Sequence, residues 1–484
     1  MKKLLLMICA FSLALVLVAC NAGGGRVPTE EPYEEPTQEP TETPTEEPTE
    51  EPTEAPKPDA FTLEFKLLDD GTYEVAGFAT GNSYQVHVEI PSTYEGKPVT
   101  GIGEKAFLRE NSGPVVWSVI IPEGVTYIAD RAFDSCSQMQ KATLPSTLKS
   151  IGSDAFFGCT LLAEINLPDS LESIGEYAFG GCKYLKSINI GPNIKNIPNS
   201  CFFNCTQLES VTLPEGLETI GQDAFYCCAF ESIDLPSTVN DIGQSAFRDC
   251  HNLKSLTIPE GITVLRTKVV WCYNLTELIL PDGLLTIEEN AICSDKLKTL
   301  VIPDSVTSIR HQALITTGLE SLTVPFAGKE ANSTPELYQY PYHIAYIFGG
   351  DSYTNKMLPN TLKTVTVTGG GILAAQAFKN CTELEVVILG DGVTATSNQT
   401  FEAMSSVKKI VLPKSIETLY SLYTPNTTVF EGYFYEGTIS EWNAIEKKDG
   451  YFYAKKILYY SETQPNESGT HWHYVDGVPT VWAD

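Results

Sequence analysis

The sequence predicts a repeat solenoid of about twelve coils, built from short β-strands and short helical or 3₁₀ turns, with a β-rich cap at each end. Three markers that recur mostly every 22 or 23 residues indicate this fold. The first is an aliphatic residue followed by Pro, at Pro122, Pro145, Pro168, Pro214, Pro236, Pro259, Pro281, Pro303 and Pro325, with Gly191 in the one position that lacks Pro. The second is Phe, usually after Ala, at Phe107, Phe133, Phe156, Phe179, Phe202, Phe225, Phe247, Phe378 and Phe401. The third is Cys, at Cys136, Cys159, Cys182, Cys205, Cys228, Cys250 and Cys272.

One full repeat, residues 162–182, shows why the chain turns where it does. Ile165 and Leu167 are two apart, so both side chains face inward from a short strand. Pro168 ends that strand because proline cannot donate to the next ladder bond. A second apolar edge then ends at Ile174-Gly175, which is a corner, and Ala-Phe follows on a tight turn. Twelve such coils at a strand spacing of about 4.8 Å would extend roughly 60 Å.

The N-terminus predicts export and anchoring. Lys2 and Lys3 precede an apolar run, residues 4–18, which is short for a bilayer span and normal for a signal peptide. The run ends in Leu17-Val18-Ala19-Cys20, which resembles the lipobox of bacterial lipoproteins. We therefore expect Cys20 to carry the lipid, since two acyl chains suffice for stable anchoring. An ordinary secretory signal cleaved nearby is the alternative.

An acidic spacer follows the anchor. Pro recurs at every fourth residue from Pro28 to Pro56, with Glu and Thr between. This composition cannot build a core and favours an extended chain, which at about 3.1 Å per residue reaches on the order of 90 Å. Residues 1–56 carry three basic and eleven acidic side chains, so −8 of the net charge of −29 lies there. The acidic balance disfavours binding to nucleic acid, which needs clustered Lys and Arg.

The remaining segments are placed by where the markers begin and stop. Alternating apolar residues with Asp70-Gly71 turn chemistry predict an N-terminal β-hairpin cap. Aromatic residues gather after the last repeat, where a cap must cover an apolar end and an open strand edge. The predicted organisation is 1–19 signal peptide, 20–27 lipidated Cys and Gly-rich tether start, 28–59 Pro/Glu/Thr spacer, 60–90 N-terminal cap, 91–325 repeats, 326–359 insertion, 360–412 further repeats, and 413–484 aromatic C-terminal cap.

At these motifs the sequence resembles a known family. The Ile-Gly-x-x-Ala-Phe-x-x-Cys pattern, over about residues 86–412, resembles the BspA-like leucine-rich repeats, also called the Treponema pallidum type. The segment Tyr435 to Trp482 is similar to the C-terminal part of such surface lipoproteins from Gram-positive anaerobic bacteria. The sequence departs from the pattern at 262–319, where Phe is lost and Cys partly lost, and at the insertion. The resemblance implies a leucine-rich repeat solenoid and, because relatives include adhesins, adhesion.

The cysteines and histidines invite a metal or disulfide interpretation that the spacing does not favour. Of 13 Cys, Cys9 leaves with the signal and Cys20 takes the lipid, so an odd number remains in the body. Stacked, in-register Cys side chains match the disulfide dihedral poorly. We expect buried thiols and no disulfide ladder. His471 and His473 would share a strand face, but no third zinc ligand is indicated, so we predict no metal site.

Two surfaces are candidates for binding. The exposed positions of the first strands form a ladder of small polar residues with almost no Trp, Tyr or Arg, the types that dominate interfaces. The sequence alone leaves open whether the insertion binds a partner or is a packing elaboration. Its aromatic residues are the candidate binding residues: Tyr338, Tyr340, Tyr342, Tyr346 and Tyr353.

No catalytic motif is present, and we expect neither an enzyme nor a cofactor. The leading hypothesis is a monomeric, lipid-anchored protein on the outer face of the bacterial membrane, which binds host matrix proteins, cell-surface proteins or glycans. In this hypothesis the only membrane contact is the lipid. The alternatives are a structural solenoid that displays other envelope components, and a polysaccharide-binding accessory protein that uses the tyrosines of the insertion.

Overall fold

The structure, a computed structural model, describes residues 61–81, 84–108, 114–331, 342–350, 357–420, 422, 427–448, 456–465 and 469–482. Residues Pro58–Asp484 form one compact unit. The predicted signal peptide, Cys20 and the spacer lie outside the described residues, as do Tyr338, Tyr340 and Tyr353. No helix among the described residues is long and apolar enough to cross a membrane.

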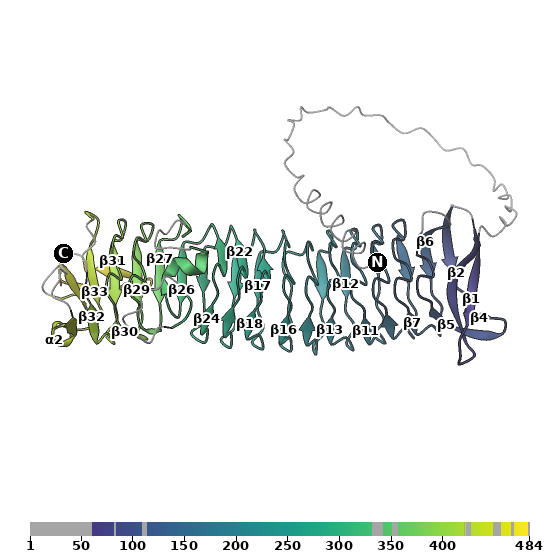
Figure 1. Ribbon diagram of the computed structural model, residues 1–484, viewed down its shortest axis with the longest axis horizontal. Helices are drawn as coiled ribbons and strands as arrows, with labels where there is room; N and C mark the ends of the chain where they lie inside the picture. Colours follow the sequence, from purple (N-terminus) through teal and green to yellow (C-terminus); the bar gives the residue numbers. More distant parts are fainter. Residues whose placement is uncertain are drawn as a thin grey trace, which may run out of the picture. The chain divides into compact units, whose positions relative to one another are not determined.

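The described residues form a β-solenoid in which most coils contribute one strand to each of two rows (Figure 1). The first row is β3 (Gln85–Glu89), β6 (Val115–Ile120), β8 (Lys141–Thr143), β10 (Glu164–Ile165), β12 (Ser187–Asn189), β14 (Ser210–Thr212), β17 (Ser255–Thr257), β20 (Glu277–Ile279), β23 (Thr299–Val301), β26 (Ser321–Val324), β27 (Thr364–Val367), β29 (Val386–Leu389), β31 (Lys409–Leu412), β33 (Gly432–Tyr435), β35 (Ile457–Tyr460) and β36 (His471–Val475). The second row is β2 (Tyr73–Gly81), β5 (Lys97–Ile102), β7 (Tyr127–Ile128), β9 (Ser150–Ile151), β11 (Ser173–Ile174), β13 (Asn196–Ile197), β15 (Thr219–Ile220), β16 (Asp241–Ile242), β18 (Val264–Leu265), β21 (Thr286–Ile287), β24 (Ser308–Ile309), β28 (Gly371–Ile372), β30 (Val393–Ala395), β32 (Thr418–Tyr420) and β34 (Glu446–Lys448).

Strands of neighbouring coils pair in parallel and in register with the sequence repeat. Ser187 of β12, for example, is opposite Ser210 of β14, one repeat later. The solenoid has about 15 turns, more than the twelve that the sequence markers predict. The difference arises at the ends, where strands continue the parallel ladder without the Pro and Ala-Phe markers. At the C-terminus β33, β35 and β36 extend the same nine-stranded sheet as β23 and β26.

The core is a stack of equivalent side chains. The Phe rings from Phe107 to Phe247 lie face to face, with neighbouring centroids 5.0–5.8 Å apart and ring planes within 10°. Beside them, each Cys thiol donates to the carbonyl of the Phe in the preceding coil, as from Cys182 Sγ to Phe156 O at 3.3 Å. The same bond recurs from Cys136 to Cys272. The Cys slot therefore supplies a hydrogen-bond donor as well as apolar volume.

All eleven cysteines in the described residues are buried. Burial raises the pKa of the Cys205 thiol to about 12. A thiol with so high a pKa carries almost no thiolate at neutral pH, and the thiolate is the form that reacts.

The residue immediately before the Ala-Phe pair adopts a left-handed backbone conformation, which the tight turn requires. The residue there has φ between 51° and 59°, although in these coils it is never Gly: Lys105, Arg131, Asp154, Tyr177, Ser200, Asp223, Ser245, Lys268, Asn290 and Gln312. A non-glycine residue in this conformation costs about 1–2 kcal/mol. The stacked coils hold the strained turn in place.

The corner glycines have a different reason. A Cβ on Gly175 would lie 2.3 Å from Ser153 N of the preceding coil, and one on Gly243 would lie 2.4 Å from Gln222 N. The Ile-Gly motif therefore marks the point where two coils approach too closely for a side chain.

The repeats that depart from the pattern form a third row of strands. Where Val270, Ile292 and Leu314 replace Phe, the turn becomes strands β19 (Val270–Trp271), β22 (Ile292–Ser294) and β25 (Leu314–Thr316), which pair in parallel. β-Branched residues favour extended backbone, and two of these three slots contain one, Val270 and Ile292.

Both ends of the described solenoid are hairpins. At the N-terminus β1 (Phe61–Leu67) pairs antiparallel with β2, and β4 (Thr93–Tyr94) pairs with β5. At the C-terminus β36 pairs antiparallel with β37 (Val478–Val481), and the buried Trp472 donates from Nε1 to Tyr435 O at 3.1 Å. Helix α2 (Ile439–Ala444) begins at a capping box formed by Thr438 and Glu441. The aromatic residues after the last repeat thus extend and close the sheet.

Candidate functional site

The first-row strands present one regular face to solvent. In nine successive coils the residue between the two inward-facing positions of the first-row segment is exposed: Ile120, Thr143, Asn166, Asn189, Thr212, Asp234, Thr257, Ile279 and Val301. Most of these side chains are short and polar, so the face offers hydrogen bonds over many coils with little apolar area to desolvate.

Three positions on this face are apolar, and two of them, Ile279 and Val301, lie in neighbouring coils. Ile279 at the end of β20 is 50% exposed, and Val301 at the end of β23 is 60% exposed. Both line an open groove of about 370 Å³, together with Leu280 and Pro303. We call Ile279 and Val301 the apolar pair. Contiguous exposed apolar side chains with a polar rim are typical of an interaction site.

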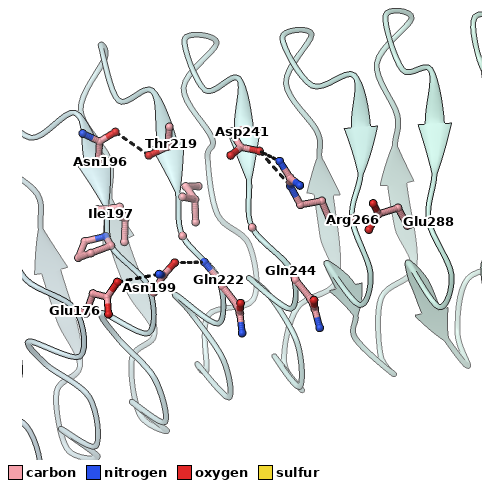
Figure 2. A pocket seen from close by; sticks show the side chains of 14 residues that line it. Glu176, Asn196, Ile197, Asn199, Thr219, Gln222, Asp241, Gln244, Arg266 and Glu288 are labelled. Carbon is pink, nitrogen blue, oxygen red and sulfur yellow. Dashed lines mark hydrogen bonds and ion pairs between the residues drawn. The ribbon is translucent and has the colours of Figure 1, made fainter.

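A second groove, of about 630 Å³, follows the corners of the second-row strands (Figure 2). Gly221 and Gly243 line its floor, where the close approach of adjacent coils leaves no room for a side chain. Pro198 and Arg266 also line it and occupy the same corner slot in flanking coils. We call this the corner groove.

Polar side chains of the corner groove bond to one another from coil to coil (Figure 2). Asn199 donates from Nδ2 to Glu176 Oε1 at 2.9 Å and accepts from Gln222 N at 2.9 Å. Arg266 donates to Asp241 Oδ1 at 2.8 and 3.2 Å, and this bonding raises the pKa of the guanidinium. The internal bonds fix the walls and use much of their hydrogen-bonding capacity. The groove is therefore a rigid, open surface.

The described part of the chain contains no group of three or more His, Cys, Asp or Glu side chains arranged to hold a metal ion. His473, one of the two histidines considered as zinc ligands, stacks on Trp482 with centroids 3.6 Å apart. This contact places His473 in the packing of the C-terminal hairpin.

Comparison with protein families identifies the repeat. The profile of the BspA type leucine rich repeat region, in 6 copies, matches residues 100–231, 218–334 and 345–433. The chain belongs to this family. The match confirms the resemblance that the Ile-Gly-x-x-Ala-Phe-x-x-Cys motifs indicate.

Solved leucine-rich repeat proteins are similar to this chain at low identity. A leucine rich cell surface protein from Faecalibacterium prausnitzii is 23% identical, with 81% of this chain and 98% of that chain covered and a TM-score of 0.43. A leucine-rich repeat protein from Bacteroides ovatus is 24% identical, with 84% and 94% covered and a TM-score of 0.47. The T. pallidum leucine rich repeat protein is 26% identical, with 46% and 82% covered and a TM-score of 0.27. No curated protein matches the chain.

Two of the five candidate tyrosines lie in the described part of this BspA type chain. Tyr342 donates from its hydroxyl to Glu330 Oε1 at 3.2 Å, and the Tyr346 ring packs edge-on against His311 with centroids 5.2 Å apart. The 3₁₀ helix η2 (Ile344–Phe348), which contains Tyr346, buries Ile344, Ala345, Ile347 and Phe348. The described part of the insertion is thus anchored in the core.

From the sequence, Ile279 and Val301 were ordinary members of the exposed ladder of the first strands, and no groove was predicted at the corners. The signal for both was present. Ile279 and Val301 are aliphatic in a slot that is otherwise mostly polar, and Arg266 stands in a slot that the motif gives to Gly. Such exceptions are visible only when each slot of the BspA type repeat is compared down the whole array.

Proposed function

We propose that this BspA type chain is a lipid-anchored surface protein that attaches to host matrix or cell-surface proteins. The signal peptide and Leu-Val-Ala-Cys20 motif support anchoring at the outer face of the membrane. The spacer then holds the repeats away from the bilayer, and the acidic net charge keeps the monomeric chain soluble. The chain acts by binding, without a catalytic step.

The apolar pair is the observation that carries the proposal. A protein interface needs a desolvated apolar centre within a polar rim, and Ile279 and Val301 provide one on a face that is mostly polar. The parallel strands on either side hold that centre rigid, so little conformational entropy is lost when a partner covers it.

Attachment can be tested by competition. The unlipidated chain from residue 21 should inhibit attachment of the bacterium to immobilised matrix proteins. Ile279→Lys with Val301→Lys should reduce inhibition at least tenfold, because two charges would be desolvated in the contact. Thr212→Lys, an exposed position on the same face, is the matched control and should inhibit like the wild type. Equal inhibition by the double variant would contradict the role of the apolar pair, and no inhibition by wild type would favour the structural alternative.

The insertion needs a point variant, because η2 is part of the core and deleting residues 326–359 would remove buried side chains. Tyr342→Ala keeps the backbone and removes the aromatic ring. If Tyr342→Ala also abolishes attachment while the double variant at the apolar pair does not, the insertion is the binding site.

Anchoring is tested separately with Cys20→Ala. The variant should appear in the culture medium, whereas the wild type should fractionate with membranes. A Cys20→Ala protein that stays with the membrane after signal cleavage would refute lipid anchoring.

A further inference from the structure

A column of partly exposed aromatic and cationic side chains runs along the outside of the Ala-Phe turns. Neighbouring ring centroids are 6.1 Å apart between Phe157 and Tyr177, 6.1 Å between Tyr177 and Phe203, and 4.8 Å between Phe203 and Tyr226. Arg248 Cζ then lies 5.4 Å from the Tyr226 centroid and 5.9 Å from that of Trp271. We call these six residues the aromatic column: Phe157, Tyr177, Phe203, Tyr226, Arg248 and Trp271.

The column follows from the repeat. Five of its members directly follow the residue in the core Phe slot, so successive coils bring them side by side. In the coil where Gly180 takes this position, a Cβ would lie 2.9 Å from the Phe157 ring. Tyr177 contacts both neighbouring rings there, so the column is continuous over six coils.

Folding does not require aromatic residues in this column. The solenoid already has a separate, fully buried stack of Phe rings. The slot after Phe is Asp134 in the coil before the column and Cys293 in the coil after it. The Asp134 coil keeps the same turn without an aromatic residue in this slot, and Tyr177 is 38% exposed. An aromatic run that the turn does not need, and that stays open to solvent, requires another explanation.

The column also carries hydrogen-bonding groups and little net charge. Arg248 Nε lies 3.4 Å from Asp249 Oδ2, so the guanidinium is paired with an acid. Trp271 donates from Nε1 to the Tyr273 hydroxyl at 2.9 Å, and Lys268 Nζ lies 5.4 Å from the Trp271 centroid. A ligand that meets this surface must satisfy apolar rings and polar groups together, without a strong positive field to select an anion.

We propose that the aromatic column binds a neutral, extended glycan chain, with about one sugar residue per coil. A pyranose ring has apolar C–H faces that pack on aromatic rings and hydroxyls that bond to Arg, Asp and Tyr side chains. The coil spacing of about 4.8 Å is close to the length that one sugar residue adds to an extended chain. The inference is independent of the apolar pair, which lies on the first-row strands.

A strip this narrow does not suit a protein partner. A standard interface buries about 800 Å² on each side, and the column is one side chain wide. A glycan chain is itself narrow and needs no wide contact area.

The test is calorimetric titration of the unlipidated chain from residue 21 with neutral linear oligosaccharides of increasing length, chosen from an array screen. Affinity should rise with each added sugar until the chain spans the column. Trp271→Ala and Tyr177→Gly should each weaken binding at least tenfold. Tyr177→Gly suits the positive φ of 55°, so it removes the ring while keeping the backbone. Tyr84→Ala, at a 70% exposed tyrosine outside the column, is the control and should bind like the wild type.

A second arm separates the two sources of such a glycan. Binding to an immobilised glycoprotein that enzymatic deglycosylation abolishes would identify a protein-attached glycan, and binding only to free polysaccharide would identify a polymer. Either result supports the proposal. The proposal would be overturned if no oligosaccharide bound or if Tyr177→Gly had the affinity of the wild type. It would also be overturned if binding to the glycoprotein survived deglycosylation and still required the residues of the aromatic column. These readouts use no cells, so failure of attachment and failure of glycan binding are distinguishable.

Discussion

Replacing Gly175 by Ala tests whether the corner glycine sets the distance between coils. The added Cβ would lie 2.3 Å from Ser153 N and 2.5 Å from Gly152 C, so the two coils must move apart by about 1 Å to restore van der Waals contact. That movement also stretches the bond from Gly175 N to Ile151 O, now 2.8 Å. Overpacking of this kind costs about 1–3 kcal/mol, and a weakened backbone hydrogen bond about 1 kcal/mol more. The expected loss is about 3 kcal/mol.

Gly191→Ala is the matched control in the next coil. Its Cβ would meet Pro168 O at 3.3 Å and would need only a small adjustment, so a change within about 1 kcal/mol is expected. Urea unfolding of both variants, with hydrogen exchange of β9 and β11, measures the global and local effects. Because each coil contacts only its neighbours, lost protection should be confined to the coils around Gly175. If Gly175→Ala were as stable as Gly191→Ala, the close-approach explanation of the Ile-Gly motif would be wrong.

Three further outcomes follow from the turn, the insertion and the thiols. Asp223→Gly should raise the urea midpoint, by about 1 kcal/mol in stability, because Asp223 has a φ of 51° that glycine adopts without strain; a lower midpoint would show that its side chain matters more than its backbone. Burial lowers the pKa of His343 to about 4 from an unfolded value near 6.5, so the unfolded chain binds more protons between these limits and stability should fall by about 3 kcal/mol as pH drops from 6.5 to 4. His343→Gln, which cannot titrate, should lose this part of the pH dependence, and an unchanged profile would count against it. Buried thiols such as Cys205 should resist alkylation until the coil unfolds, and rapid labelling of the native protein would contradict their burial.

The inward-facing residues were predictable because every coil puts the same slot in the same environment. Phe179 and Phe202 repeat one arrangement, so the periodicity of the sequence is sufficient to identify the core. The number of turns was not predictable from the markers alone. At the C-terminus Tyr433 and Leu458 are buried in strands that lack Pro and Ala-Phe, and only pairing in three dimensions shows that these strands belong to the ladder.

The outward-facing residues were harder to interpret. Aromatic residues were sought where they crowd in the sequence, in the insertion and near the C-terminus, whereas Phe203 and Tyr226 are a full repeat apart and meet only when the coils stack. The described part of the insertion shows the opposite error. Its tyrosines were the candidate binding residues, whereas Ile344 and Phe348 pack in the core and hold the segment in position.

Departures from the repeat concentrate between Arg248 and Val301. In these coils Arg266 and Glu288 replace the corner glycine, β-strands replace two Phe turns, and Trp271 and the apolar pair are partly exposed. A solenoid tolerates such changes locally because each coil is stabilised by its nearest neighbours, so one region can diverge while the others keep the regular pattern. The core gains nothing from an exposed Ile279 or Val301, whose side chains bury little apolar area in the folded chain. The proposed partner would cover them and so account for their presence, and substitutions in this central region should therefore separate binding from folding most cleanly.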